Sequence, residues 1–133
     1  MKLICCVDDS MGMAFNNRRL SQDRAVVDDI LSLVGSARLV ADEYTAKLFE
    51  GKNVNLMIAS NPLEKALPED FVFVERTDPA PYANQIDWVC LYFWNRHYPS
   101  MVKFTMDLSR WTRSEMREFS GNSHEISQCV YAR

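Results

Sequence analysis

The chain has 133 residues, of which 47% are hydrophobic and 25% charged, and its formal net charge is −3. This length and composition predict a single soluble domain over residues 1–133, and the negative charge disfavours binding to nucleic acid or to an anionic membrane. The sequence contains no apolar stretch long enough to span a membrane, no signal-peptide pattern and no C-x-x-C pair among its four cysteines. We therefore expect a cytoplasmic protein with reduced cysteines.

The N-terminal stretch predicts a buried strand, a polar loop and an amphipathic helix. The strand is the apolar run Leu3–Val7, the loop includes Gly12 and residues 16–19, and the helix runs from Ser21 to a stop at Gly35. A strand followed by a helix at the start of the chain is typical of α/β domains.

One carboxylate lies on the apolar face of this predicted helix. Asp23 shares that face with aliphatic residues spaced three and four apart, which are Val26, Val27, Ile30, Leu31 and Val34. An acid in this place is either a helix-start residue, favoured by the helix dipole, or a residue of a binding site. A carboxylate binds a flat amidine-like ligand well, because two parallel hydrogen bonds fix both position and orientation. Both interpretations of Asp23 stay open.

The middle of the chain alternates predicted strands with short helices. The predicted strands are residues 38–41, 54–59, 71–74 and 88–94. The predicted helical segments are residues 43–50, capped by Asp42, and single turns at 63–67 and 82–85. Residues 88–94 are nearly all apolar, as in a central strand covered on both faces.

The end of the chain predicts a hairpin. A short strand is predicted at residues 101–104, and residues 111–119 have mixed polarity. A turn at Gly121-Asn122 precedes residues 125–131, which alternate between two faces. Strands alternating with helices, followed by a tail of strands alone, predict an α/β fold with a mainly parallel sheet and an antiparallel edge.

Several kinds of site lack their usual motifs. His97 and His124 are the only histidines, and neither has a second ligand at helical or hairpin spacing, so no metal site is predicted. The chain has no G-x-S-x-G, no local cysteine–histidine signature and no pair of glycines close enough for a phosphate loop. Acid chemistry at Asp23 is the remaining candidate.

Three stretches resemble dihydrofolate reductase, in the order in which that family has them. The opening reads KLICCVDDSMGMAFNNRRLSQDR and resembles the family's first strand, its Met-Gly loop over the active site and the helix with the pterin-binding acid. The stretch EGKNVNLMIASNP resembles the G-R-x-N strand, and Trp111, Phe119 and GNSHEISQCVYAR resemble the closing hairpin. The resemblance implies a three-layer α/β fold with a mainly parallel mixed sheet, shortened by roughly one βα unit between Ser60 and Phe71.

The resemblance also implies a set of site residues. Asp23 takes the place of the pterin-binding carboxylate, which would support protonation of the substrate ring in an active reductase. The implied substrate-binding positions are Met13 with Gly12 in the mobile loop, Val27 one turn after the acid, Lys52 at an arginine that holds the folate glutamate, and Trp94 at a threonine that hydrogen-bonds the acid. Lysine keeps the charge of that arginine but loses its bidentate fork.

The positions that the resemblance implies for the cofactor depart from the family. A Gly-Gly pair and a Gly-Arg pair approach the NADPH phosphates in these reductases. Here the corresponding stretches are Glu75-Arg76-Thr77 and Ala41-Asp42. A side chain then occupies the space that backbone needs, and both acids bring negative charge toward the phosphates. We therefore expect a degraded NADPH site and no cofactor.

Three functions remain open. The first is a divergent dihydrofolate-reductase-like protein with a pocket near Asp23 for a small flat, pterin-like heterocycle. The second is an active NADPH-dependent reductase of dihydrofolate or another pteridine. The third is a non-enzymatic interaction module, in which a sheet edge or face exposed by the shortening binds a partner chain, so that the protein is a monomer or a homodimer. Aromatic candidates for that surface are Tyr92, Trp94, Tyr98 and Trp111, with Tyr92 and Trp94 expected in the core.

Overall fold

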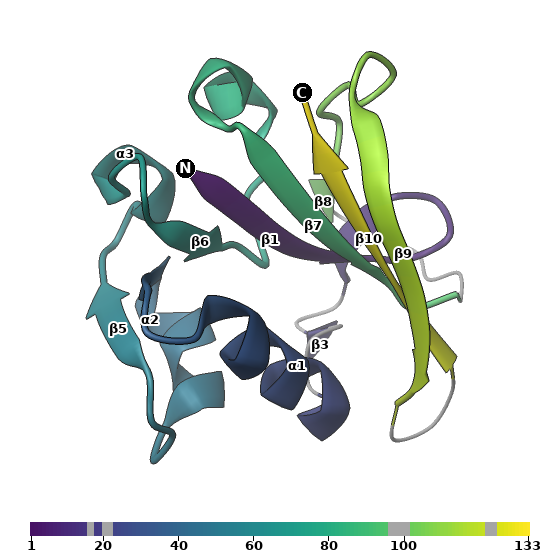
Figure 1. The fold of residues 1–133 in the computed structure, drawn as a ribbon. Coiled ribbons are helices and arrows are strands. Elements are labelled where there is room, and N and C mark those ends of the chain that lie inside the picture. Colours follow the sequence, from purple (N-terminus) through teal and green to yellow (C-terminus); the bar gives the residue numbers. More distant parts are fainter. Residues whose placement is uncertain (16–17, 20–22, 96–101, 122–124) are drawn as a thin grey trace.

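The computed structural model describes the chain except for residues 16–17, 20–22, 96–101 and 122–124. A seven-stranded sheet with the order β5-β4-β6-β1-β7-β10-β9 forms its centre (Figure 1). Five of these strands are parallel to one another: β1 (Lys2–Val7), β4 (Arg38–Ala41), β5 (Asn55–Ile58), β6 (Phe71–Phe73) and β7 (Trp88–Phe93). The hairpin of β9 (Thr112–Ser120) and β10 (Glu125–Ala132) joins β7 antiparallel. The predicted mainly parallel sheet with a C-terminal antiparallel hairpin is confirmed.

Helix α1 (Arg24–Val34) buries the aliphatic face that the sequence predicts. Val26, Val27 and Ile30 pack on the sheet, together with Val34. The helix ends at Gly35, whose φ of 57° and ψ of −125° lie in a region that residues with a Cβ rarely adopt. No described helix has the length and apolar character needed to cross a membrane.

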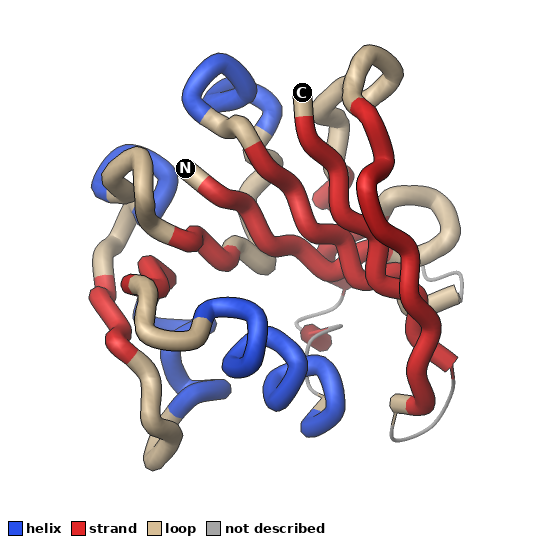
Figure 2. Tube along the Cα trace, viewed as in Figure 1, coloured by secondary structure: helices blue, strands red, loops and turns tan. Residues whose placement is uncertain are grey.

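Side chains on the two faces of the sheet build two separate cores. Ile4 and Cys6 of β1 face the core under α1, whereas Leu3, Cys5 and Val7 face the other one, because successive side chains of a strand alternate. Figure 2 shows the short helical segments that connect the strands. They are α2 (Glu43–Ala46), η1 (Lys47–Phe49), α3 (Pro62–Lys65) and η2 (Ala80–Gln85).

A small second sheet forms where the sequence predicts a polar loop. Its order is β3-β2-β8, with β2 (Gly12–Phe15), β3 (Arg18–Arg19) and β8 (Val102–Lys103). The loop prediction was therefore wrong for β2 and β3. The reason is that β2 pairs with β8, which lies far along the chain, and such pairing leaves no trace in local periodicity.

Strand β5 lies at one edge of the large sheet. Only the single turn α3 separates β5 from β6, and the chain then returns to insert β6 between β4 and β1. No described segment forms a further strand outside β5. The short connection after Ser60 therefore leaves this edge open.

Candidate functional site

Asp23 is the N-cap of α1 and is almost completely buried. The residue is 2% exposed, and its Oδ1 accepts a hydrogen bond of 2.8 Å from the backbone N–H of Ala25. Its backbone oxygen accepts the first helical hydrogen bond, from the N–H of Val27 at 3.0 Å. Asp23 is thus a helix-start residue by geometry. A capping carboxylate at a buried helix end can also bind a ligand, so the role of Asp23 as a residue of a binding site remains a prediction.

Two of the other predicted residues, Val27 and Trp94, are buried in the core that α1 covers. Val27 and Trp94 belong to one core cluster with Cys6, on the face of the sheet that α1 covers. Trp94 follows β7 and is only 9% exposed. Burial, and secondly the charge of Glu75, raises the pKa of the Cys6 thiol. Val27, Trp94 and Cys6 are therefore core residues on the face of the sheet that α1 covers.

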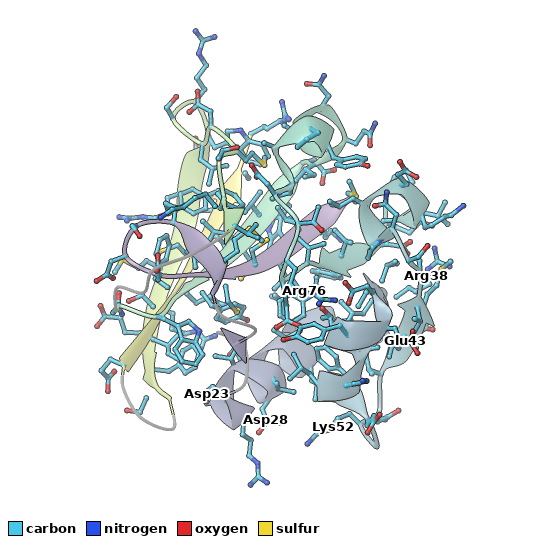
Figure 3. The ribbon with its side chains drawn as sticks, turned by 180° about the vertical axis from the view of Figure 1, so that it is seen from behind. Asp23, Asp28, Arg38, Glu43, Lys52 and Arg76 are labelled. Carbon is cyan, nitrogen blue, oxygen red and sulfur yellow. The ribbon has the colours of Figure 1, made fainter. Side chains whose placement is uncertain are left out.

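The remaining predicted residues lie elsewhere. Met13 is buried in β2 and packs in the core on the opposite face of the sheet, near Val7 and Phe104. Lys52 is exposed in the turn before β5, and Figure 3 shows it away from Asp23. A ligand contact of Met13 or Lys52 stays a prediction.

A cavity of about 260 Å³ lies at the carboxyl ends of β4, β5 and β6. In α/β sheets this edge is where ligands commonly bind. The cavity contains the positions that the resemblance implies for the cofactor phosphates. It is lined by Asp42, Ser60, Asn61, Pro62, Leu63, Val74, Glu75, Arg76, Thr77 and Tyr82.

Two carboxylates dominate the electrostatics of this cleft. Asp42 caps α2, since its Oδ1 accepts a hydrogen bond of 2.8 Å from the backbone N–H of Thr45. Glu75 is buried directly after β6. Among the described lining residues Arg76 is the one cation. Its Nη2 lies 3.8 Å from Asp42 Oδ2, and its guanidinium lies 3.8 Å from the centroid of the Tyr44 ring. The cation is thus already engaged by an acid and an aromatic ring.

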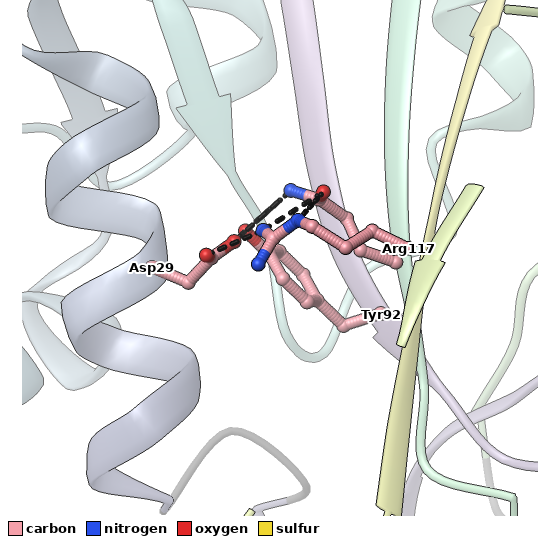
Figure 4. A network of polar contacts seen from close by, with 4 residues as sticks. Asp29, Tyr92 and Arg117 are labelled. Atoms are coloured by element: carbon pink, nitrogen blue, oxygen red, sulfur yellow. Dashed lines mark hydrogen bonds and ion pairs between the residues drawn. The ribbon is translucent and has the colours of Figure 1, made fainter. Parts of the chain in front are cut away.

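A polar network that sequence reasoning missed ties α1 to three strands (Figure 4). Asp29 Oδ2 accepts hydrogen bonds of 2.6 Å from the Tyr92 hydroxyl and 3.0 Å from Gln128 Nε2. Arg117 Nη2 donates to Asp29 Oδ1 at 2.5 Å and to Gln128 Oε1 at 3.0 Å. One feature of the sequence could have indicated this network. Gln128 is the one polar residue on the inward face of an alternating strand whose other inward residues are apolar.

The described part of the chain contains no group of three His, Cys, Asp or Glu side chains placed to hold a metal ion. His97 and His124 lie outside the described residues, as does Tyr98. Tyr92 and Trp94 are buried in the core, as expected, and Trp111 is half-buried.

No protein-family model and no curated protein sequence matches the chain. Among solved structures it is similar to dihydrofolate reductase from Enterococcus faecalis complexed with NADP(H) and RAB-propyl. The TM-score is 0.70, the alignment covers 99% of this chain and 95% of that chain, and the sequence identity is 10%. At this identity the likeness bears on the fold and not on the activity. The chain therefore has a dihydrofolate-reductase-like fold.

Proposed function

We propose that this chain is a divergent dihydrofolate-reductase-like protein that binds a small flat heterocycle near Asp23 and does not bind NADPH. The likeness in fold to a reductase complexed with NADP(H) supports a small-molecule site in this scaffold. The cytoplasmic location expected from the sequence agrees with such a role.

The ligand class follows from the chemistry around Asp23. A carboxylate accepts two parallel hydrogen bonds, and an amidine-like ring edge presents such a donor pair. Asp23 Oδ1 also accepts from the N–H of Ala25, so a ligand donor would share that oxygen. Val27, one turn after Asp23 on α1, and Trp94, in the same core cluster as Val27, are the candidates for the apolar surface against which a flat ring packs. A pterin has both the donor pair and the flat ring.

The loss of NADPH binding rests on Asp42 and Glu75, the observation that carries this proposal. Phosphates are bound by backbone N–H groups and cations, and here the N–H of Thr45 already donates to the Asp42 carboxylate. Glu75 adds a second buried acid in the same cleft. The residues present therefore do not fit a dinucleotide, because anions would be brought against carboxylates.

A thermal-shift experiment with Asp23→Asn and Asp28→Asn tests this proposal. Asparagine is as good an N-cap as aspartate, so Asp23→Asn keeps the helix start and removes the charge. Asp28 is exposed on the same helix and serves as the matched control. A pterin should stabilise the wild-type protein and Asp28→Asn but not Asp23→Asn, whereas NADPH should stabilise none of them. Reproducible stabilisation by NADPH of about 2 °C or more would overturn the proposal.

An active NADPH-dependent reductase is the second candidate, favoured by the likeness to a structure that contains NADP(H). It predicts oxidation of NADPH in the presence of dihydrofolate or a related pteridine, followed by absorbance. Turnover that Asp23→Asn abolishes and Asp28→Asn retains would replace the first proposal with this one.

A further inference from the structure

At the open edge of the sheet, no described strand pairs with the outer backbone groups of β5. The N–H of Ala59 donates to the Ala41 oxygen on β4 at 2.9 Å. Backbone groups of successive strand residues point in opposite directions, so those of Leu56 and Ile58 point away from β4. No described strand lies on that side (Figure 1).

Apolar side chains accompany this open edge. Ile58 is 56% exposed, and it lines a cavity of about 270 Å³ together with Leu56. The charged lining residues of this cavity are exposed, whereas its apolar lining residues other than Ile58 are buried or half-buried. The other lining residues are Glu43, Ala46, Lys47, Phe49 and Glu50.

The two edge strands of the sheet differ in how well they are protected against pairing with another chain. β9, at the opposite edge, carries Arg113, Glu115, Arg117 and Glu118 within nine residues. Charges of this kind discourage pairing with another chain. β5 has the sequence NLMI, with no charge and no proline. Its edge is therefore the one suited to pairing.

We propose that β5 is the contact surface of a homodimer, in which β5 of a second copy pairs with it in antiparallel orientation about a two-fold axis at Met57. In this register Leu56 lies opposite Ile58 of the second copy. Both residues have outward-pointing backbone groups, so each such pair exchanges both hydrogen bonds. Their side chains lie on one face and form a shared apolar cluster beside the two cavities.

Charge complementarity favours a second copy over an unrelated strand. Lys52 precedes the start of β5, whereas Glu43 lines the same cavity as Ile58, at the end of β5 (Figure 3). Antiparallel pairing reverses one copy, so Lys52 of each copy comes to the end that carries Glu43 of the other. The two-fold axis generates the contact between Lys52 and Glu43 a second time, as an isologous interface requires.

Light scattering after size-exclusion chromatography tests the contact. The wild-type protein should have twice the chain mass of 15.4 kDa at about 100 µM, a concentration at which a dimer with a micromolar Kd is almost fully formed. Ile58→Lys should be a folded monomer, because the side chain is exposed in the single chain. Met116→Lys is the matched control, since Met116 is 53% exposed on the opposite edge, and it should remain dimeric. A monomeric wild-type protein, or a dimeric Ile58→Lys variant, would overturn the proposal.

A charge reversal tests the register. Lys52→Glu and Glu43→Lys should each weaken the dimer, and the double variant should restore it, because the opposite charges again face each other. A double variant weaker than both single ones would reject the antiparallel two-fold arrangement. This inference does not depend on a ligand near Asp23, so Ile58→Lys should leave any pterin-induced stabilisation unchanged.

Discussion

Arg117 on β9 donates a hydrogen bond of 2.5 Å to Asp29 on α1, across 88 positions of the sequence. The same carboxylate accepts from Tyr92 on β7 and from Gln128 on β10. Asp29 therefore joins the first helix to three strands of the sheet. Burial raises the pKa of Tyr92 far above its ordinary value, so its hydroxyl remains a donor across the pH range of the folded protein.

Replacing Asp29 by alanine should lower the free energy of unfolding by about 2 to 3 kcal/mol, because buried Tyr92 and Gln128 lose their acceptor. Asp28→Ala changes an exposed neighbour on the same helix and should cost less than about 0.5 kcal/mol. Urea unfolding measures both values. Equal effects of the two substitutions would show that the network contributes nothing specific.

The Arg38–Asp70 pair should make stability depend on acid pH. Burial alone raises the pKa of Asp70, but the hydrogen bonds from Arg38 and from the N–H of Leu67 outweigh it and hold this pKa below 3.8. A carboxylate with a lowered pKa stabilises the fold above its unfolded-state pKa, and that stabilisation is lost as the pH falls through the folded-state value.

Asp70→Asn should therefore cost about 2 kcal/mol at pH 7, and the difference from wild type should shrink below pH of about 4. Urea unfolding at a series of pH values measures this. Asp28→Asn is exposed and should show no such pH-dependent difference. A constant difference between wild type and Asp70→Asn from pH 7 to pH 2 would contradict the ionic role of Asp70.

The cysteines should be inert in the folded protein. Burial raises the pKa of Cys90 to about 12 and also raises the pKa values of Cys5 and Cys6. At pH 8 these thiols carry almost no thiolate, and they lie in the core. A colorimetric thiol reagent should label none of the four cysteines in buffer and all four in urea. Labelling of one thiol faster than global unfolding would reveal local opening of its strand.

Gly35→Ala should destabilise the protein by about 1 to 2 kcal/mol. A Cβ at Gly35 would meet no atom within 4 Å, so the cost comes from its φ of +57° and not from a clash. Asparagine should not rescue the fold, because the ψ of −125° lies outside the left-handed basin that asparagine tolerates. Ser36→Ala, at the next exposed position, is the control for thermal unfolding, and a loss as large as that of Gly35→Ala would refute the backbone explanation.

Local patterns predicted most elements of the fold. The strand at Leu3–Val7 and the aliphatic face of α1 follow from periodicity, and Asp42 caps α2 as its residue type predicts. The same patterns missed β2, which forms only because β8 pairs with it. They also missed Asp29, because its partners come from three strands distant in sequence.

The candidate site was predictable only in part. The spacing on α1 singled out Asp23, and the structure shows it buried at the helix start. The sequence showed acids at Asp42 and Glu75, but the stacking of Arg76 on Tyr44 depends on the packing of α2 against the segment after β6. The sequence gives the chemical groups that the site contains, whereas the packing of the fold determines which of these groups contact each other.

Local sequence patterns were sufficient for most strands and helices of the large sheet, for the aliphatic face of α1 and for the polarity of the closing hairpin, because these depend on residues a few positions apart. Only the tertiary structure decided that β5 is an open edge, that Asp29 joins four elements and that Asp42 and Glu75 share a cleft. Each of these features depends on which distant segments pack together. The free energy of that packing comes from contacts across the whole sheet and not from any single stretch of sequence.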